Sequence, residues 1–410
     1  MISQEAQTIR EKFSEFYAEK DLAACLPPEL KSREFGFLLF RERTMLRHRK
    51  FEDLKALREF ISTIVPSDVY YSSAYFEDPE QEMEEKGWLG ADLVFDIDSD
   101  HIPTACRKIH DRWLCRNCSL LGRGPSPERC PKCGEARFDS KTWACEVCIE
   151  SVKSETIKLV SMLLEDFGFS RNSVKVYFSG HRGYHVHVDD ESVHKLDSMA
   201  RKEIVDYVIG LGLKAKLHRV VDNRRIPLAS DLEEGGWKKR IGFGIYKLIT
   251  ESTSSEMDRL SLSKSVLKNL RESKEAMQTL GETKWINVKE RGKSWEKIID
   301  FIVSQQSSRI DTVVTTDIHR LIRLSGSLHG KTALMKVEAP LIGLSEFDPL
   351  KEAVAFKKGA IVVDIVEAPR FRIGDTFYGP YKNSLHVELP SAAALFLLCK
   401  NAAKVVKYSV

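Results

Sequence analysis

The chain has 410 residues and a mass of 46.7 kDa, which is longer than one hydrophobic core usually grows, so we expect two domains or one core with insertions. Hydrophobic residues make up 42% and charged residues 30%, which argues against a disordered or fibrous chain. No run of about 18 apolar residues occurs, which excludes a membrane span. The net charge of +3 neither requires nor excludes a nucleic-acid partner.

The N-terminal part predicts a helix followed by strands. The first residues, MISQEAQTIREKFSEF, are charged, helix-patterned and without the apolar segment of a secretion signal, so we expect a cytoplasmic, nucleoid-associated protein. This helix is expected to reach about Lys31, with a break at Pro27 and Pro28. REFGFLLF and RTMLRHRKF then predict a strand pair. Residues 54–64 predict a helix, and the Tyr-rich residues 69–76 predict a strand.

The middle of the chain combines a buried strand, a cysteine-rich segment and a hairpin. ADLVFDIDSD is a buried-strand pattern that ends in carboxylates. Residues 103–150 form a cysteine-rich insertion, and residues 150–167 have the spacing of an amphipathic helix. VKVYF, SGHRG and YHVHVD predict strand, tight turn and strand.

The second half predicts a helical block and a return to strands. Residues 198–302 are mostly polar helix, interrupted by the basic stretch KAKLHRVVDNRRIP, and EMDRLSLSKSVLKNLRESKEAM is the clearest helix. RIDTVVTTD predicts a strand, HRLIRL a short helical or extended run, SGSLHGKT a loop, and residues 392–406 a last apolar helix. We therefore expect an α+β core formed by residues 1–205 and 303–410, an insertion at 103–150 and a helical subdomain at 206–302.

Two carboxylates share one face of the buried strand. Side chains alternate along a strand, so Asp96 and Asp98 lie roughly 6–7 Å apart on the face opposite Phe95. Such a pair can hold hard divalent cations for phosphoryl transfer. The alternative is that the strand ends here and its acids face solvent, because Asp-x-Asp alone is a weak signal. Asp311, in another β-patterned run, is the candidate third carboxylate if the two strands are neighbours.

The segment SGHRGYHVHV is the most specific short pattern. Its glycines allow the backbone to approach a ligand closely. Ser179, Arg182 and His185 can then converge on a triphosphate as a hydroxyl, a forked cation and an imidazole donor. The alternative is a plain β-hairpin with its histidines on a polar face. Farther on, Arg320 and Arg323 share one side if their stretch is helical, and such a cluster is interesting only as a second phosphate contact.

Seven of the nine cysteines fall between Cys106 and Cys148, which in a reducing compartment indicates metal rather than disulfides. The spacing C-x2-C, eleven residues, C-x2-C is that of a zinc ribbon, with ligands Cys115, Cys118, Cys130 and Cys133. A second site is predicted from the flanking residues Cys106, His110, Cys145 and Cys148. Two alternatives stay open for this second site: His101 could replace His110 as a ligand, or Cys106 could be no ligand at all. Both sites use four ligands, so we expect structural zinc.

The segments FDID, SGHRGYHVHV and RLIRLSGSLHG, in that order, resemble the small catalytic subunit of archaeal and eukaryotic DNA primase, over about residues 34–331. The resemblance implies a mixed-sheet α+β catalytic core with a zinc knuckle between its first two motifs, which fits the four flanking ligands. The extra ribbon departs from the family pattern. It leaves open a template-contacting or partner-contacting module and a passive stabiliser.

The resemblance also implies roles for individual residues. Metal ions, Mg²⁺ or Mn²⁺, are expected on Asp96, Asp98 and Asp311. The nucleotide is expected to contact Ser179, Arg182, His185, Arg323 and His329, and also Glu34 and Arg47, which stand where the family places nucleotide contacts.

The implied activity is template-directed synthesis of short primers from nucleoside triphosphates, a nucleotidyl transfer. The implied partners are a primase large subunit in a heterodimer, a single-stranded DNA template and the replication machinery. Two other functions remain open: a primase-like repair polymerase that extends existing primers, and a non-catalytic zinc-ribbon protein that binds nucleic acid. The intact acid triad argues against the second of these.

Overall fold

The computed structural model describes residues 3–40, 45–213, 225–227, 235–251, 253, 268, 285–287 and 293–406. Its backbone contacts divide the chain into two compact units. The first unit consists of Met1–Thr156, Arg171–Arg201 and Ile310–Val410, and the second of Ile157–Ser170 and Lys202–Arg309. All residues that were predicted to act in catalysis, nucleotide binding or zinc binding belong to the first unit.

The N-terminal helix α1 (Gln4–Glu19) is shorter than predicted. Ser3 caps its start by accepting a hydrogen bond from the Ala6 amide, and the helix buries Phe13 and Tyr17. Lys20 is already extended, and short 3₁₀ turns at Ala23–Cys25 and Leu30–Ser32 replace the expected continuation. The chain therefore leaves the helix several residues before the Pro27–Pro28 break.

The first sheet confirms the predicted strand pair and the predicted helix after it. Its strands are antiparallel and follow the order β14-β3-β1-β2. Their bounds are β1 (Phe35–Leu38), β2 (Met45–Arg49), β3 (Asp68–Ser72) and β14 (Leu321–Arg323). Helix α2 (Leu54–Ile64) has the predicted limits and is capped by Asp53.

The Tyr-rich run at residues 69–76 forms two strands rather than one. Strand β3 ends at Ser72, whose hydroxyl accepts from the Glu34 amide and donates to the Ala74 carbonyl oxygen. These bonds interrupt the ladder, and β4 (Ala74–Phe76) then pairs with β5 (Trp88–Ala91) in a separate sheet. Apart from the half-buried Tyr70, the apolar and aromatic residues of β3 and β4 are buried, so the hydrophobic pattern alone did not reveal the interruption.

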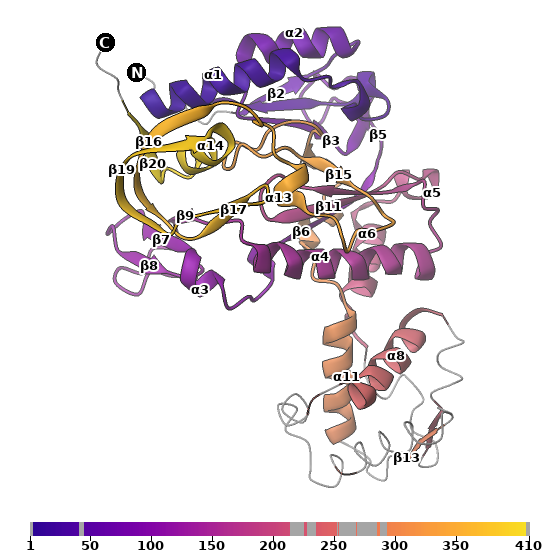
Figure 1. The fold of residues 1–410 in the computed structure, drawn as a ribbon. Coiled ribbons are helices and arrows are strands. Elements are labelled where there is room, and N and C mark those ends of the chain that lie inside the picture. Colours follow the sequence, from indigo (N-terminus) through magenta and orange to yellow (C-terminus); the bar gives the residue numbers. More distant parts are fainter. Residues whose placement is uncertain are drawn as a thin grey trace. The chain divides into compact units, whose positions relative to one another are not determined.

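The second sheet contains the acidic strand and the hairpin, as expected (Figure 1). It has the order β15-β10-β11-β6, with β6 (Leu93–Asp98), β10 (Val174–Phe178), β11 (Gly183–Val188) and β15 (Val337–Ala339). Leu93, Phe95 and Ile97 are fully buried on the apolar face of β6. The predicted amphipathic helix is α4 (Glu146–Ser161), which continues as a π turn at Met162–Asp166.

The cysteine-rich insertion is a small structure with its own sheet. Helix α3 (Arg107–His110) precedes a three-stranded sheet of order β8-β7-β9, formed by β7 (Arg112–Cys115), β8 (Leu121–Arg123) and β9 (Phe138–Lys141). Trp113, Cys115 and Cys130 form its buried cluster, against which Phe138 packs. So small a core needs additional stabilisation, and metal-binding cysteines are the usual source.

The C-terminal part adds a further antiparallel sheet, of order β19-β16-β20. The expected last helix ends earlier than predicted, because α14 (Ser391–Cys399) is followed by Asn401 in the left-handed conformation, a common helix end, and then by β20. The other elements here are α13 (Pro349–Glu352), β16 (Ala360–Ala368), β17 (Phe371–Ile373), β18 (Thr376–Tyr378), β19 (Tyr381–Pro390) and β20 (Ala403–Val405).

The described part of the second unit is mainly helical. Helices α8 (Gly236–Thr250) and α11 (Lys293–Gln306) pack closely, since a Cβ at Gly244 would lie 2.3 Å from Ile302 Cγ2. Strands β12 (Arg225–Pro227) and β13 (Trp285–Asn287) pair. Helix α5 (Glu191–His194) belongs to the first unit, and α6 (Ser198–Val208) begins there and continues into the second. The predicted helix EMDRL…KEAM, apart from Lys268, and most of the basic stretch lie outside the described residues.

The molecule is an α+β protein, as predicted. Every strand pair in the described ranges is antiparallel, whereas the resemblance implied a mixed-sheet core. Among the described residues, no helix is both long and apolar enough to cross a membrane.

Candidate active site and zinc clusters

The end of β6 carries the predicted carboxylate pair. Asp96 lies opposite His185 in the antiparallel ladder with β11, and Asp98 lies opposite Gly183. Cross-strand partners project to the same face, and His185 Nε2 is 3.6 Å from Asp96 Oδ1. The hairpin and the acidic strand therefore lie side by side, and Asp96 and Asp98 share one face of β6 as predicted.

The third carboxylate, Asp311, joins this site in a different local structure from the one predicted. The run RIDTVVTTD contains α12 (Thr312–Thr316) instead of a strand, because Asp311 caps the helix by accepting from the Val313 amide at 3.0 Å. The Asp311 amide donates to the Asp96 carbonyl oxygen at 2.8 Å, so the two residues are direct neighbours. The predicted strand is wrong, whereas the predicted proximity of Asp311 to the pair is found.

The carboxylates repel one another. Burial raises the pKa of Asp96 to about 7, and the Asp98 and Asp311 carboxylates contribute in the same direction. Burial and the neighbouring Asp100 likewise raise the pKa of Asp98 above its usual range. Bound divalent cations would remove this repulsion, and carboxylate oxygens are the ligands that Mg²⁺ and Mn²⁺ prefer. The residues therefore fit such ions.

A cleft of about 190 Å³ opens beside these acids. Six of the predicted site residues line it: Asp96, Asp98, Ser179, His185, Arg323 and His329. Arg320, considered with Arg323 as a second phosphate contact, also lines it, and so do Tyr70 and His181, which no predicted role included. The strand β14 places Arg323 beside the cleft, so the helical spacing considered for Arg320 and Arg323 does not apply.

The cleft histidines are neutral. Burial is the main cause that lowers the pKa of His185 and His329 well below the usual value, and nearby Lys336 and Arg323, respectively, add to it. The Lys331 amide donates to His329 Nδ1 at 3.1 Å, so the proton of this neutral ring is on Nε2. His329 can therefore donate a hydrogen bond to an anionic oxygen without carrying charge.

Arg323 is a buried cation that is held in place. Its Nη1 is 2.5 Å from Asp68 Oδ1, and its Nη2 donates to the Tyr70 hydroxyl oxygen at 3.1 Å. Burial lowers the pKa of Arg323, but the Asp68 carboxylate more than offsets this and the pKa is raised. The guanidinium is thus charged and preorganised at the cleft wall.

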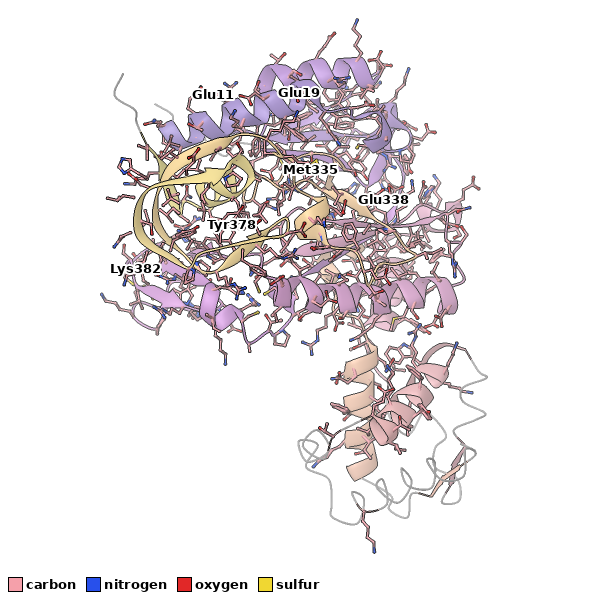
Figure 2. All side chains as sticks on the ribbon, in the orientation of Figure 1. Glu11, Glu19, Met335, Glu338, Tyr378 and Lys382 are labelled. Carbon is pink, nitrogen blue, oxygen red and sulfur yellow. The ribbon has the colours of Figure 1, made fainter. Side chains whose placement is uncertain are left out.

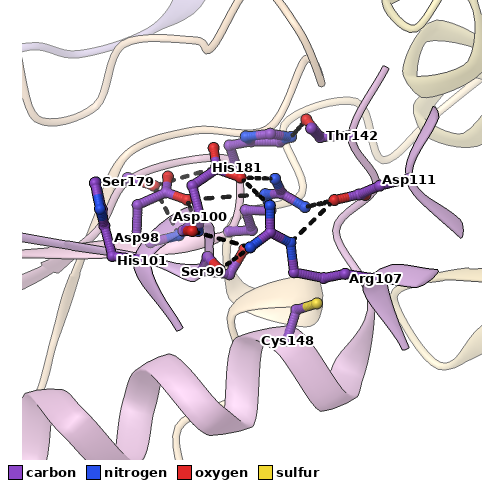
Figure 3. Close-up of polar contacts among 12 residues, drawn as sticks. Asp98, Ser99, Asp100, His101, Arg107, Asp111, Thr142, Cys148, Ser179 and His181 are labelled. Carbon is purple, nitrogen blue, oxygen red and sulfur yellow. Dashed lines mark hydrogen bonds and ion pairs between the residues drawn. The ribbon is translucent and has the colours of Figure 1, made fainter. Parts of the chain in front are cut away.

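Arg182 does not line the cleft, unlike the predicted triphosphate contact. Its side chain is 0% exposed, and Nη1 donates to both carboxylate oxygens of Asp111 at 3.1 and 3.0 Å. Nη2 binds Asp100, and Nε lies 3.8 Å from Asp98 Oδ1. Arg107, labelled in Figure 3, donates to the same two acids, to Asp111 at 3.2 Å and to Asp100 at 2.9 Å. Arg182 is therefore placed to orient Asp98.

Glu34 and Arg47 form an ion pair with each other. Glu34 accepts from Arg47 Nε at 2.9 Å and from the buried Lys86 ammonium at 2.7 Å. Although burial opposes it, these cations lower the pKa of Glu34. Neither residue is among those that line the cleft, so their expected contact with nucleotide stays a prediction.

Both cysteine clusters assemble as predicted. In each cluster, the four ligand atoms lie within 4.8 Å of one another. The first cluster consists of Cys106, His110, Cys145 and Cys148, and the second of Cys115, Cys118, Cys130 and Cys133. His110, rather than the alternative His101, belongs to the first group; His101 Nε2 instead lies 3.8 Å from Asp311 Oδ2. His110 Nδ1 is 2.8 Å from Asp111, which is the orienting contact typical of a zinc-bound histidine.

The acid triad differs from these clusters in spacing. In the described residues, the ligand atoms of Asp92, Asp189 and His194 also lie within 4.8 Å of one another. The carboxylate oxygens of Asp96, Asp98 and Asp311 do not all meet this distance, so the triad is more widely spaced. Asp92 is already bound by Arg33 at 2.8 Å and by the Tyr75 hydroxyl at 2.6 Å.

Comparison with known proteins agrees with this geometry. The family model for the DNA primase small subunit matches residues 131–341. The DNA primase small subunit PriS of Cenarchaeum symbiosum is 34% identical, over 96% of this chain and 97% of its own. The PriS proteins of Methanothrix thermoacetophila and Archaeoglobus fulgidus are 33% and 34% identical, over 99% and 96% of this chain and 100% and 97% of theirs. The chain belongs to the DNA primase small-subunit family.

Membership in the primase small-subunit family, of the archaeal type, confirms the resemblance drawn from the motifs. The primase cleft also contains residues that the motifs did not identify. Tyr70 lies on β3 and no local pattern marks it, whereas Arg320, which directly precedes β14, was marked only by its spacing to Arg323. His181 belongs to the segment SGHRG but was given no role, yet it lies at the cleft wall with its ring centroid 5.3 Å from that of His329.

The ligand sets of this primase subunit predict two zinc ions per chain. Elemental analysis of the purified chain should give about two, and Cys133→Ser or Cys145→Ser should each lower the content to about one, because each removes one ligand of a four-ligand site. Cys25→Ser, outside both clusters, should leave the content unchanged. A measured content of one zinc ion in the unaltered chain would contradict one of the two site assignments.

Proposed function

We propose that this chain is the catalytic subunit of a DNA-dependent primase, which joins nucleoside triphosphates on a single-stranded DNA template by two-metal nucleotidyl transfer. The observation that supports this proposal most is the meeting of Asp96, Asp98 and Asp311 beside a cleft with neutral histidines and a fixed arginine. Bound Mg²⁺ or Mn²⁺ would activate the attacking 3′-hydroxyl and neutralise charge on the pyrophosphate that leaves.

The chain's own residues would position the nucleotide. Arg323 and His329 present a cation and a neutral donor to the triphosphate, and Ser179 and His185 approach it from the hairpin. Because Arg323 is already held by Asp68 and Tyr70, it loses little freedom when it binds. No covalent nucleophile is needed, since positioning and electrostatic stabilisation account for this class of reaction.

Arg182 has a different role in this proposal from the one its motif implies. Its bidentate contact with Asp111 and its approach to Asp98 make it a positioning residue for the metal-binding carboxylates. The zinc clusters are closed by four protein ligands each and serve the structure. The relatives' description as a small subunit points to a large-subunit partner for this chain.

Primer-free synthesis tests the proposal. The chain, alone and with a large subunit, is incubated with single-stranded DNA and labelled nucleotides, with and without Mn²⁺. Products made without any primer are expected. Extension of added primers alone would instead indicate a repair polymerase, and no incorporation even with the large subunit would indicate a nucleic-acid-binding protein.

A further inference from the structure

A second, larger cavity lies between the cysteine-rich insertion and the C-terminal sheet. Its volume is about 1170 Å³, which exceeds the roughly 300–1,000 Å³ of ordinary small-molecule sites. Some of its lining residues come from β7 and β9 of the zinc-ribbon sheet, and others from the ends of β16 and β19 and the segment after α14. The size of the cavity indicates an extended ligand.

The charge of this cavity is strongly positive. Six cationic side chains and two carboxylates line it. The two carboxylates are occupied, because Glu367 binds Arg112 at 2.5 Å and Asp139 binds Arg116 at 2.7 Å. Four ammonium groups therefore lack a carboxylate partner in the described structure: Lys141, Lys331, Lys382 and Lys400. Lys331 and Lys382 are exposed and Lys141 is half-buried, and these three cations favour a polyanion, whereas burial lowers the pKa of Lys400 well below its usual value.

Two of these lysines have notable surroundings. Lys400 is only 6% exposed. Its side-chain nitrogen lies 2.7 Å from His181 Nε2, and no carboxylate of the described residues pairs with it. Lys382, labelled on β19 in Figure 2, is exposed; its cross-strand neighbour Glu367 is the carboxylate that Arg112 already binds. Burying a lysine without a carboxylate is costly, so a ligand that supplies the missing charge would stabilise this arrangement.

The cavity also has aromatic walls and reaches the active site. Phe138 and Tyr381, both half-buried, line it beside the lysines, and such rings can stack on unpaired bases. Thr142 and Lys400 line the cavity and contact the imidazole of His181, at 3.4 and 2.7 Å, while His181 lines the catalytic cleft. One side chain thus separates the two spaces.

We propose that this cavity binds single-stranded polynucleotide next to the catalytic cleft, with the lysines on its phosphates and the aromatic rings on its bases. The zinc ribbon then has a function, because it forms one wall of the channel. The nature of the ligand rests on the proposed primase function. The strand is either the DNA template or the newly made product, since both present the same phosphate and base chemistry.

Binding without catalysis tests this proposal. The zinc-loaded full chain is titrated with labelled oligodeoxythymidylate and, separately, oligouridylate over a salt series, without nucleotides or divalent cations. Lys382→Ala should weaken binding of at least one oligonucleotide roughly fivefold and reduce the slope of log affinity against log salt by about 0.7, the value for one lost contact to a single strand. Lys382→Arg should retain both.

The control and the outcomes separate the alternatives. Lys55→Ala, on α2 and 83% exposed at its side chain, should change nothing. Loss restricted to the DNA oligonucleotide assigns the cavity to the template, and loss restricted to RNA assigns it to the product. If Lys382→Ala left the oligonucleotide affinity and its salt slope unchanged, the proposal would be overturned. The same holds if the variant weakened only the binding of a free nucleoside triphosphate and not that of the oligonucleotides. Primer synthesis is measured separately, so a chain that binds but does not synthesise contradicts only the proposed function.

Discussion

Asp96→Asn is expected to lower nucleotide incorporation by roughly a thousandfold or more. The change removes a charged ligand from the proposed metal site, and such ions contribute several kcal/mol of transition-state stabilisation, at about 1.4 kcal/mol for each factor of ten in rate. The measurement is the rate of primer-free synthesis at saturating template and nucleotide. Asp375→Asn, on an exposed hairpin with a side chain that is 77% exposed, is the matched control and should keep the normal rate.

The same variant should not destabilise the metal-free chain. The pKa of Asp96 rises from 3.8 to about 7 in the folded state, so the folded chain disfavours the charged carboxylate. This penalty is absent below about pH 4, increases as the pH rises toward 7, and is complete above 7. Asparagine cannot ionise, so at pH 8 the variant should unfold at the same or a higher denaturant concentration. Normal synthesis by Asp96→Asn would refute the metal assignment.

Arg182→Ala should lower the free energy of unfolding by about 3–5 kcal/mol, the usual cost of removing one partner from a buried ion pair. The guanidinium is fully buried, and its loss removes its hydrogen bonds to Asp111, its contact with Asp100 and its approach to Asp98, whereas Arg107 still contacts Asp100 and Asp111. Denaturant unfolding of the zinc-loaded chain measures the effect. Arg182→Lys keeps the charge but not the forked geometry, and should be intermediate.

A variant of a second arginine, Arg320 at the cleft, helps to distinguish a positioning role for Arg182 from a phosphate contact. Arg320 lines the cleft and is half-buried, and no side-chain ion pair holds it in the described structure. Arg320→Ala should therefore leave the unfolding free energy nearly unchanged. If Arg182→Ala were as stable as the normal chain and only weakened nucleotide binding, Arg182 would be a phosphate contact, as the motif comparison implied.

Patterns that depend on neighbouring residues predicted the structure well. Alternation and a glycine turn predicted β10, β11 and the acid face of β6, and the spacing of cysteine pairs predicted both ligand clusters. Errors occurred where a distant contact outweighed the local preference. The β-branched run after Asp311 predicts a strand, yet it folds as a helix because Asp311 caps it and hydrogen-bonds to β6.

The motif SGHRG shows the same division within five residues. Its chemistry indicated an anion site, and Ser179 and His181 do line the cleft. Arg182, between them and His185, is instead covered by Asp100 and Asp111, and Asp111 comes from the cysteine-rich insertion. No spacing within the motif could show that this carboxylate would occupy the guanidinium.

Residue types and short spacings thus specified the chemistry of this protein: carboxylates for divalent cations, thiolates for zinc, and cations with imidazoles for phosphates. They could do so because ligand geometry is set over a few residues of chain. Which of those groups are open to a ligand depended on folding. Burial of Arg182, the opening of the cleft at Arg320 and the lysine-lined cavity all arise where segments far apart in the chain come together, and solvent exposure is a property of those contacts.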